Sequence, residues 1–316
     1  MTTLNLKKAK YSLATEFGLS DVPPTAMIEG YEGVHPAIPP IKDYVFQREK
    51  LRDILAFWTS PQNALKIQGD PATGKTSLVE QWHARLRWPL YKVSCCRSTE
   101  STRLIGGMLP QTDGSLKWFD GPVLKAAREG TSVLLDEYNT LDPDQATGLN
   151  MLLEGYGITI EQTGEVVTPQ PGFRVFATEN DVQSRLSVTG RNPQDAANDD
   201  RWMNMAADYL PAELEIKAVF QALVNARIKS DRAELVATEV VKLANEVRTA
   251  YRNEESSIEK PMSTRTVIRW ALLIDRYQSV PKEQGGPTVY ALHRAFAMSK
   301  DMASAVDVKA RAQFGI

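Results

Sequence analysis

The sequence predicts an α/β fold, in which helices cover both faces of a parallel sheet, followed by a separate all-α domain. Strand-like apolar runs alternate with helical patterns from Ala64 onward, and parallel strands need such crossover connections. A complete phosphate-binding loop motif stands between the first of these strands and the helix that follows it. After Pro211 the pattern changes to long amphipathic helices, which indicates a second domain.

The length and the charge of the chain limit its organisation and its partners. Its 316 residues exceed one typical domain and favour a large α/β unit with a smaller one. The 37 Lys and Arg residues nearly balance the 39 Asp and Glu residues, and the formal net charge is -2. This balance gives no overall attraction for nucleic acid or anionic lipid, so we expect neither as a main partner, although a local basic groove remains open.

Several features predict a cytoplasmic protein without a membrane span. No strictly apolar run exceeds five residues, whereas a span needs about twenty. The N-terminal residues MTTLNLKKAK lack a following apolar stretch, so no secretory signal is expected. Cys95 and Cys96 are adjacent, a spacing that builds neither a disulfide framework nor a metal site, and this favours a reducing compartment. Three scattered histidines give no reason to expect a metal held by protein side chains alone.

Residues 1–45 are expected to form an N-terminal arm that lies over the folded domain. This segment lacks sustained periodicity, and its prolines exclude a regular helix or a central strand. These prolines are Pro23, Pro24, Pro36, Pro39 and Pro40. The first helix is predicted from Gln47 to Trp58, where apolar residues recur at helical spacing, and Pro61 then ends the segment.

The α/β core is expected to span residues 46–210. Its strands are predicted at Ala64–Gln68, Leu90–Ser94, Ser132–Leu135 and Arg174–Thr178, and its helices at Thr76–Leu86, Gly121–Glu129 and Asp144–Glu154. Two β-hairpins are expected to project from the sheet, because turn residues stand between strand-like flanks in two places. They are Thr112–Trp118, around Asp113-Gly114, and Ile158–Val167, around Thr163-Gly164.

Residues 211–316 are predicted to form an all-helical domain. Apolar residues recur there at helical spacing, and short polar or Pro/Gly-containing linkers separate the periodic segments. The predicted helices are Ala212–Arg227, Arg232–Arg252, Ser263–Gln278 and Val289–Lys300.

The most specific motif is a phosphate-binding loop. Gly69 to Thr76 spell GDPATGKT, a full match to G-x-x-x-x-G-K-[ST]. Backbone N–H groups of such a loop surround the phosphates of a nucleotide, and the dipole of the following helix adds to the attraction. Lys75 is expected to neutralise the β- and γ-phosphates, and Thr76 to bind Mg²⁺ through its hydroxyl. The sequence thus predicts ATP and Mg²⁺ as ligands, with nucleotide contacts from Gly69, Asp70, Pro71, Ala72, Thr73, Gly74, Lys75, Thr76 and Ser77.

Polar residues follow two of the other predicted strands. Asp136 and Glu137 end the strand that begins at Ser132, and Asn180 follows the strand that begins at Arg174. Asp136 is expected to hold Mg²⁺ through water, and Glu137 to polarise the attacking water as a general base. Asn180 would emerge at the same sheet edge and orient that water, although the capping of a turn is an alternative role. Downstream of a full phosphate-binding loop, the acidic pair is strong evidence for nucleotide hydrolysis.

These residues and several further motifs resemble the MoxR-type AAA+ ATPases, and within them the ATPase subunit of aerobic cobaltochelatase, CobS. The resemblance covers residues 22–273. It implies an AAA+ P-loop NTPase core with a helical lid domain, and a homo-oligomer, a hexameric ring, with ATP at each subunit boundary. The motifs that carry it are Asp43–Phe46, Arg85–Pro89, Leu104–Gly106, Asp136–Tyr138, Phe173–Asn180, Asp200–Trp202, Tyr209–Pro211 and Met262–Ile268.

The resemblance also implies roles for three side chains. Asn180 corresponds to the first sensor of the family, Arg201 resembles the arginine finger that enters a neighbouring site, and Arg265 resembles the second sensor. An arginine that completes a site in trans stabilises charge on the transferring phosphoryl group. Arg185 and Arg191 are rivals of Arg201 for the finger. In simpler interpretations, Arg201 forms a surface ion pair and Arg265 is a charge in the first turn of a helix.

The resemblance implies a remodelling ATPase that acts on a partner protein, such as a von Willebrand factor A-type metal-binding subunit, with cobalt insertion as one instance. Residues 181–191 differ from the glycine-rich stretch of the cobaltochelatase subunit. A nucleic-acid motor or loader is the alternative, because it uses the same nucleotide chemistry. A regulatory switch that binds ATP without fast turnover is a third, against which Glu137 argues. Trp118 and Phe119, in the first hairpin, either line a central pore or pack the hairpin on its own helix.

Overall fold

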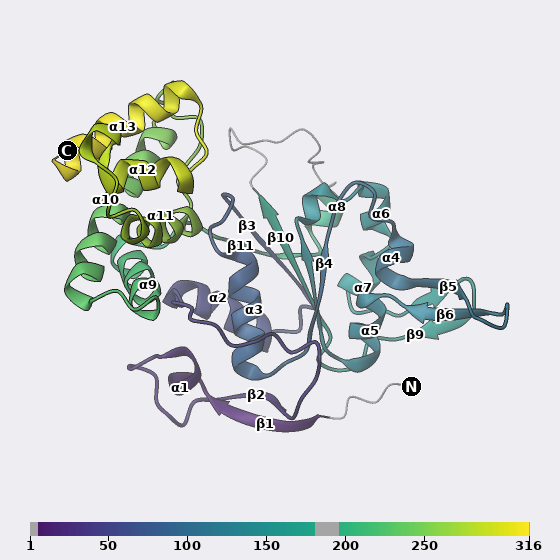
Figure 1. Cartoon of the computed structure of the whole chain (residues 1–316). Helices are drawn as coiled ribbons and strands as arrows, with labels where there is room; N and C mark the ends of the chain where they lie inside the picture. Colours follow the sequence, from purple (N-terminus) through teal and green to yellow (C-terminus); the bar gives the residue numbers. More distant parts are fainter. Residues whose placement is uncertain (1–5, 181–195, 316) are drawn as a thin grey trace. The chain divides into compact units, whose positions relative to one another are not determined.

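A computed structural model describes residues 6–180 and 196–315 (Figure 1). The described chain divides into two compact units. The first comprises residues 6–69, 74–180 and 196–207, and the second comprises residues 70–73 and 208–315. Four residues of the phosphate-binding loop therefore belong with the C-terminal segment.

A five-stranded parallel sheet forms the centre of the first unit. Four of its strands correspond to predicted strands, whereas the sequence did not predict the edge strand β11. The strand order is β11-β3-β10-β7-β4, with β3 Ala64–Gly69, β4 Leu90–Ser94, β7 Ser132–Asp136, β10 Arg174–Asn180 and β11 Met203–Ala206. The predicted fold class, a parallel sheet with helices and an all-helical C-terminal region, is confirmed.

Helices cover both faces of this sheet (Figure 1). Two helices share one apolar cluster with Leu65 and Phe176, and these are α2 Arg48–Thr59 and α3 Lys75–Leu86. Helices on the other face share a second cluster with Val133 and Val175. They include α5 Pro122–Glu129, α6 Pro143–Thr147 and α7 Asn150–Leu153, and the short helices α4 Ser101–Ile105 and α8 Ala196–Asp199 complete the unit.

The helix predicted at Asp144–Glu154 is interrupted, so that α6 and α7 replace it. At the break, the Leu149 N–H bonds to the Ala146 carbonyl, three residues back, at 3.0 Å. Such a bond tightens the turn, and the break falls beside Gly148, a residue of low helix propensity.

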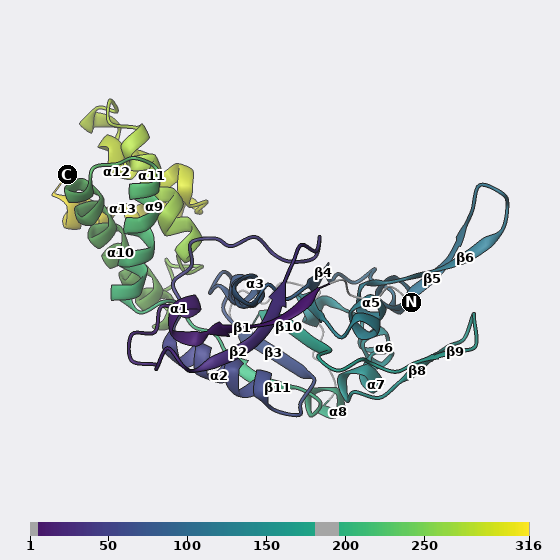
Figure 2. The ribbon, with the colours of Figure 1, turned by 90° about the horizontal axis from the view of Figure 1, so that it is seen from below.

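Both predicted hairpins form, and they extend to the same side of the first unit (Figure 2). Trp118 packs in a small apolar cluster with Leu124 and donates through Nε1 to Asp120 at 2.8 Å, whereas Phe119 is 43% exposed. Phe119 is therefore the more exposed of the pair, and Trp118 is partly buried. The strands are β5 Gly106–Pro110, β6 Leu116–Asp120, β8 Ile158–Ile160 and β9 Glu165–Val167.

The N-terminal segment is more regular than its prolines suggest. β1 Lys7–Ser12 and β2 Met27–Glu32 form an antiparallel pair, and α1 Leu13–Phe17 connects to β1. The prolines lie outside these strands, so they do not oppose the pairing. The Phe17 ring stacks on Trp82 of α3 with ring centroids 4.9 Å apart, which anchors the segment in the first unit.

The second unit is helical throughout its regular structure. Its apolar core includes the fully buried Trp270. The sequence did not predict the last helix, whose N-cap Ser299 accepts from the Met302 N–H at 3.3 Å. The helices are α9 Ala212–Asn225, α10 Ser230–Arg252, α11 Thr264–Arg276, α12 Gly286–Ala295 and α13 Lys300–Phe314. Across the ranges 6–180 and 196–315, every helix falls short of the length and apolar character that a bilayer span requires.

Candidate active site

The phosphate-binding loop has a backbone shape that few side chains allow. Gly69, Ala72 and Gly74 have φ angles of 155°, 60° and 87°. A Cβ on Gly69 would lie 1.9 Å from the carbonyl oxygen of Ala207, so this close approach requires glycine. Helix α3 begins directly after the loop, at Lys75, and its first N–H groups have no partner within the helix. The loop and the helix start therefore fit a phosphate group.

Lys75 and Asn180 meet at the end of the sheet. The Lys75 Nζ donates to the Gly69 carbonyl oxygen at 2.9 Å and to Oδ1 of Asn180 at 3.0 Å. The Lys75 side chain is buried, although its charge favours water. Asn180 pairs with Gly69 in the parallel register of β10 with β3. This register places the Asn180 side chain beside the phosphate-binding loop.

Asp136 accepts hydrogen bonds from two hydroxyl groups at the same edge of the sheet. Its Oδ1 accepts from Thr76 Oγ1 at 2.8 Å and from Thr178 Oγ1. Hydroxyl and carboxylate oxygens are the hard ligands that Mg²⁺ takes, usually together with water. The donor set of Thr76 and Asp136 therefore fits this ion.

Glu137 occupies a strained position directly after β7. Its φ of 58° lies in the left-handed region, which costs a non-glycine residue about 1–3 kcal/mol. The Glu137 N–H donates to Thr178 Oγ1 at 3.1 Å, and its carbonyl accepts from the Thr140 hydroxyl at 2.7 Å. These bonds hold the turn, and the side chain is exposed beside Asp136.

Two polar residues of the site were missed from the sequence. Thr178 bridges Asp136 and the Glu137 N–H, and Asn139 donates through Nδ2 to the Asn180 carbonyl at 2.9 Å. Thr178 has a weak signal, since it lies two residues before Asn180 and thus on the same strand face. Asn139 has no such signal, because it belongs to a short 3₁₀ turn that no sequence periodicity predicts.

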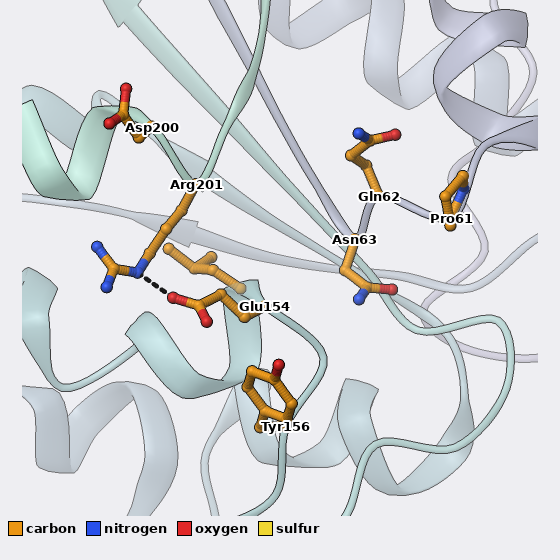
Figure 3. A pocket seen from close by; sticks show the side chains of 8 residues that line it. Pro61, Gln62, Asn63, Glu154, Tyr156, Asp200 and Arg201 are labelled. Carbon is orange, nitrogen blue, oxygen red and sulfur yellow. Dashed lines mark hydrogen bonds and ion pairs between the residues drawn. The ribbon is translucent and has the colours of Figure 1, made fainter.

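Arg201 lies in a pocket where its side chain faces Glu154 (Figure 3). It precedes β11, which runs parallel to β3, so Arg201 stands where the strands begin, whereas the phosphate-binding loop follows the end of β3. The Arg201 Nε pairs with Glu154 on the wall of an open pocket of about 650 Å³, which Asn63 and Tyr156 also line. The structure therefore does not bring Arg201 to the loop of its own chain.

A buried polar cluster joins residues of β3, β10 and α8. Lys66 is 1% exposed, and its Nζ lies 2.5 Å from Oδ1 of Asp199 and 3.8 Å from Oε2 of Glu179. Gln68 Nε2 donates to Glu179 at 2.9 Å. Burial raises the pKa of Glu179, against the lowering effects of the Gln68 hydrogen bond and the Lys66 charge.

Of the other predicted arginines, the structure describes Arg265. Arg265 is the second residue of α11, whose N-cap Ser263 accepts from the Thr266 N–H at 3.1 Å, and its side chain is exposed. Arg185 and Arg191, the rivals of Arg201, lie outside the described residues. Ser77 lies in the first turn of α3 and is half-buried.

Two family models match the chain in separate segments. A model described as "AAA domain (dynein-related subfamily)" matches residues 64–201, and a model described as "CbbQ/NirQ/NorQ C-terminal" matches residues 222–312. The first match contains β3, β7 and β10, and the second contains α10 to α12.

Comparisons with known proteins give relatives that align with most of the chain. The aerobic cobaltochelatase subunit CobS of a Sinorhizobium species is 30% identical over 279 residues, which are 84% of this chain and 81% of that protein. The denitrification regulatory protein NirQ of Stutzerimonas stutzeri is 33% identical, over 66% of this chain and 70% of its own length. NirQ of Pseudomonas aeruginosa is 30% identical, over 66% of this chain and 75% of its own.

Proposed function

Because the chain belongs to the MoxR-type AAA+ ATPases, we propose that it hydrolyses ATP with Mg²⁺ and couples this turnover to the remodelling of a partner protein. The proposal includes a cytoplasmic ring of identical subunits, six as in the family it resembles. Its main support is the grouping of Lys75, Thr76, Asp136 and Asn180 at one edge of the sheet. That edge, at the carboxyl ends of parallel strands, is where α/β folds bind their ligands.

Each group at this edge has a task in the proposed reaction. Lys75, which now donates to two neutral oxygens, binds oxygens of the terminal phosphates. Glu137 accepts a proton from the attacking water, and Asn180 orients that water. Mg²⁺ held by Thr76 and Asp136 supplies positive charge to the phosphate oxygens when it is bound.

The position of Arg201 supports action between subunits. It lies where the strands begin, at the opposite end of the sheet from the loop. The phosphate group that it could meet therefore belongs to another copy of the chain. A guanidinium that reaches the phosphoryl group in trans contributes about 10³–10⁵ in rate in related NTPases. We therefore propose Arg201 as the arginine finger and Arg265 as the second sensor.

A subunit-mixing experiment tests this function. Lys75→Ala removes the phosphate contact but keeps Arg201, whereas Arg201→Ala keeps an intact loop. Each variant alone should hydrolyse ATP at least 100-fold more slowly than the parent. Their equimolar mixture should recover a clear fraction of the parent rate, because some sites then combine an intact loop with an intact finger. A Lys75→Ala protein that retains the parent rate would contradict ATP hydrolysis at this site, and a mixture without recovery would contradict action in trans.

The partner class is proposed from the relatives. One relative is named as a subunit of aerobic cobaltochelatase and so belongs to an enzyme of several chains. We propose that this chain likewise acts on a separate protein of the von Willebrand factor A type. Purification of Glu137→Gln from its native cell with ATP should retain such a protein, and release it when ATP is removed. Salt-dependent binding to DNA in place of a protein partner would favour the nucleic-acid motor instead.

A further inference from the structure

The second unit buries a polar cluster around Arg248. Arg248 is 3% exposed, and its two terminal nitrogens donate to both carboxylate oxygens of the fully buried Glu215, at 2.6 and 2.8 Å. The same guanidinium donates to Oδ1 of Asn245 at 3.0 Å and, through Nε, to the carbonyl of Met262 at 2.7 Å. Four acceptors thus fix the plane of the guanidinium, a geometry that lysine cannot reproduce.

One side of this cluster reaches the phosphate-binding loop. The Tyr209 hydroxyl donates to the Pro71 carbonyl at 3.2 Å, and residues 70–73 belong to the same compact unit as Tyr209. The Arg248 guanidinium lies 4.2 Å from the centre of the Tyr209 ring. Burial raises the pKa of Tyr209, so its hydroxyl keeps the proton that it donates. The loop backbone and Arg248 therefore share one aromatic side chain.

The other side of the cluster reaches the start of α11. Thr264, the first residue of that helix, donates through Oγ1 to Glu215 at 2.7 Å. Arg248 holds the carbonyl of Met262, two residues earlier. Both bonds fix the backbone next to Arg265, the proposed second sensor.

A pair of this kind contributes more to geometry than to stability. Removing two charges from water costs several kcal/mol each, and apolar pairs of similar volume are often as stable. What the ion pair adds is directional bonds to Met262, Asn245 and Thr264, which apolar side chains would lack.

We propose that Tyr209, Arg248, Glu215 and Thr264 are positioning residues that link the phosphate-binding loop to Arg265. Through them, a change in the carbonyl position at Pro71 alters the placement of the α11 start and of its arginine. The inference rests on the proposed function, because it assigns the regulation of the same nucleotide site. It applies to turnover rather than to nucleotide affinity, since none of the four side chains is proposed to touch ATP.

Tyr209→Phe tests the link to the loop. The variant keeps the ring under Arg248 and removes only the hydroxyl. Loss of one hydrogen bond should lower kcat by about 2- to 10-fold, with the Kd for a slowly hydrolysed ATP analogue unchanged within about 2-fold. Tyr11→Phe is the matched control, because its hydroxyl also donates to a backbone carbonyl, that of Tyr31 at 2.6 Å, far along the chain from the loop. The control should keep the parent kcat.

Thr264 offers an isosteric pair that tests the link to α11. Thr264→Val keeps the shape and removes the hydroxyl bonded to Glu215, whereas Thr264→Ser retains it. Glu215 keeps its two bonds from Arg248 in both variants, so the fold is preserved. Thr264→Val should lower kcat to the same degree as Tyr209→Phe, and Thr264→Ser should restore it.

A double-mutant cycle separates positioning from a general loss of structure. In an Arg265→Ala background, Tyr209→Phe and Thr264→Val should cause no further fall in kcat, because both act through Arg265. Additive losses in that background would overturn the inference. So would parent-like kcat for both single variants in a protein that Lys75→Ala inactivates, and that result would leave the proposed function standing. Full activity of Lys75→Ala would remove the proposed function and the inference together.

Discussion

The two units place their polar groups by different means. In the first unit, the strand register brings Asp136 and Asn180 to one sheet edge, and the loop that follows β3 brings Lys75, the first residue of α3, to the same edge. In the second unit, helices carry Glu215 and Arg248 into an apolar core, where side-chain hydrogen bonds fix them, both to each other and to their neighbours. Backbone geometry thus sets the site at the sheet edge, whereas side-chain hydrogen bonds set the cluster in the helical core. Change at the first should affect the chemistry directly, whereas change at the second should affect stability and, through the proposed positioning residues, turnover.

The largest effect is expected at the sheet edge. Glu137→Gln removes the proposed general base and should lower kcat by about 10²–10⁴-fold, while the protein still binds ATP and the ring becomes more stable. Steady-state turnover and size-exclusion chromatography with ATP check both parts. Glu161→Gln, at an exposed position of the second hairpin, is the matched control and should behave as the parent. A variant with unchanged turnover would remove Glu137 from the reaction.

The next effect concerns stability in the helical core. Arg248→Met leaves Glu215 charged and buried and should lower the free energy of unfolding by about 3–5 kcal/mol. The double variant Arg248→Met, Glu215→Leu should recover most of that loss. Lys66→Met should cost less, because the Asp199 side chain is 47% exposed and Glu179, whose pKa burial already raises, can take up a proton. Urea unfolding of the three variants tests this order, and an equal or larger loss for Lys66→Met would contradict it.

A pH effect is expected in the helix that follows the phosphate-binding loop. His83 is fully buried on α3, and burial lowers its pKa from 6.5 to about 4. Between these values the unfolded chain binds a proton that the folded chain does not, so stability is retained above pH 6.5 and lost as the pH falls towards 4. The full shift corresponds to about 3 kcal/mol.

Urea unfolding between pH 7.5 and 4.5, with hydrogen exchange resolved by segment, measures this loss. His83→Leu should remove most of the pH dependence of α3. His293→Gln, which changes a histidine beside Asp307 in the second unit, should leave it in place. An unchanged slope in His83→Leu would assign the acid sensitivity to another group.

The smallest expected effect concerns Arg201. Glu154 pairs with the Nε of this residue, and exposed ion pairs contribute about 0.2–1 kcal/mol. Glu154→Gln should weaken one restraint on the guanidinium and raise kcat by about 1.5- to 5-fold. The gain should disappear in an Arg201→Ala background. A gain that persists there would mean that Glu154 acts by another route.

β3, β7 and β10 could be predicted because most of their residues are buried and form apolar runs, as at Ser132–Leu135. The edge strand β11 is short and contains Asn204, so no apolar run indicates it. β1 contains three lysines and no apolar run, and among the described strands it pairs with β2, a pairing that no local sequence pattern indicates. Tertiary pairing, rather than local propensity, creates both.

The site residues likewise differ in how far the sequence predicts them. The phosphate-binding loop and the acidic pair have fixed spacings that chemistry imposes, and both segments meet in the structure through the bond between Thr76 and Asp136. Thr178 contributes one hydroxyl, and its only sequence signal is its position two residues before Asn180. Glu215 and Arg248 are 33 residues apart on different helices, so only the packing of α9 on α10 reveals them.

The contact between Gly69 and Ala207 limits how substitutions in the loop can be interpreted. A methyl group on Gly69 would overlap the Ala207 carbonyl, so Gly69→Ala would push two main-chain segments apart before any nucleotide arrives. Inactivity of that variant would therefore report mechanical damage to the scaffold. Lys75, whose side chain can be shortened without a clash, is the sounder place to ask whether the protein binds ATP.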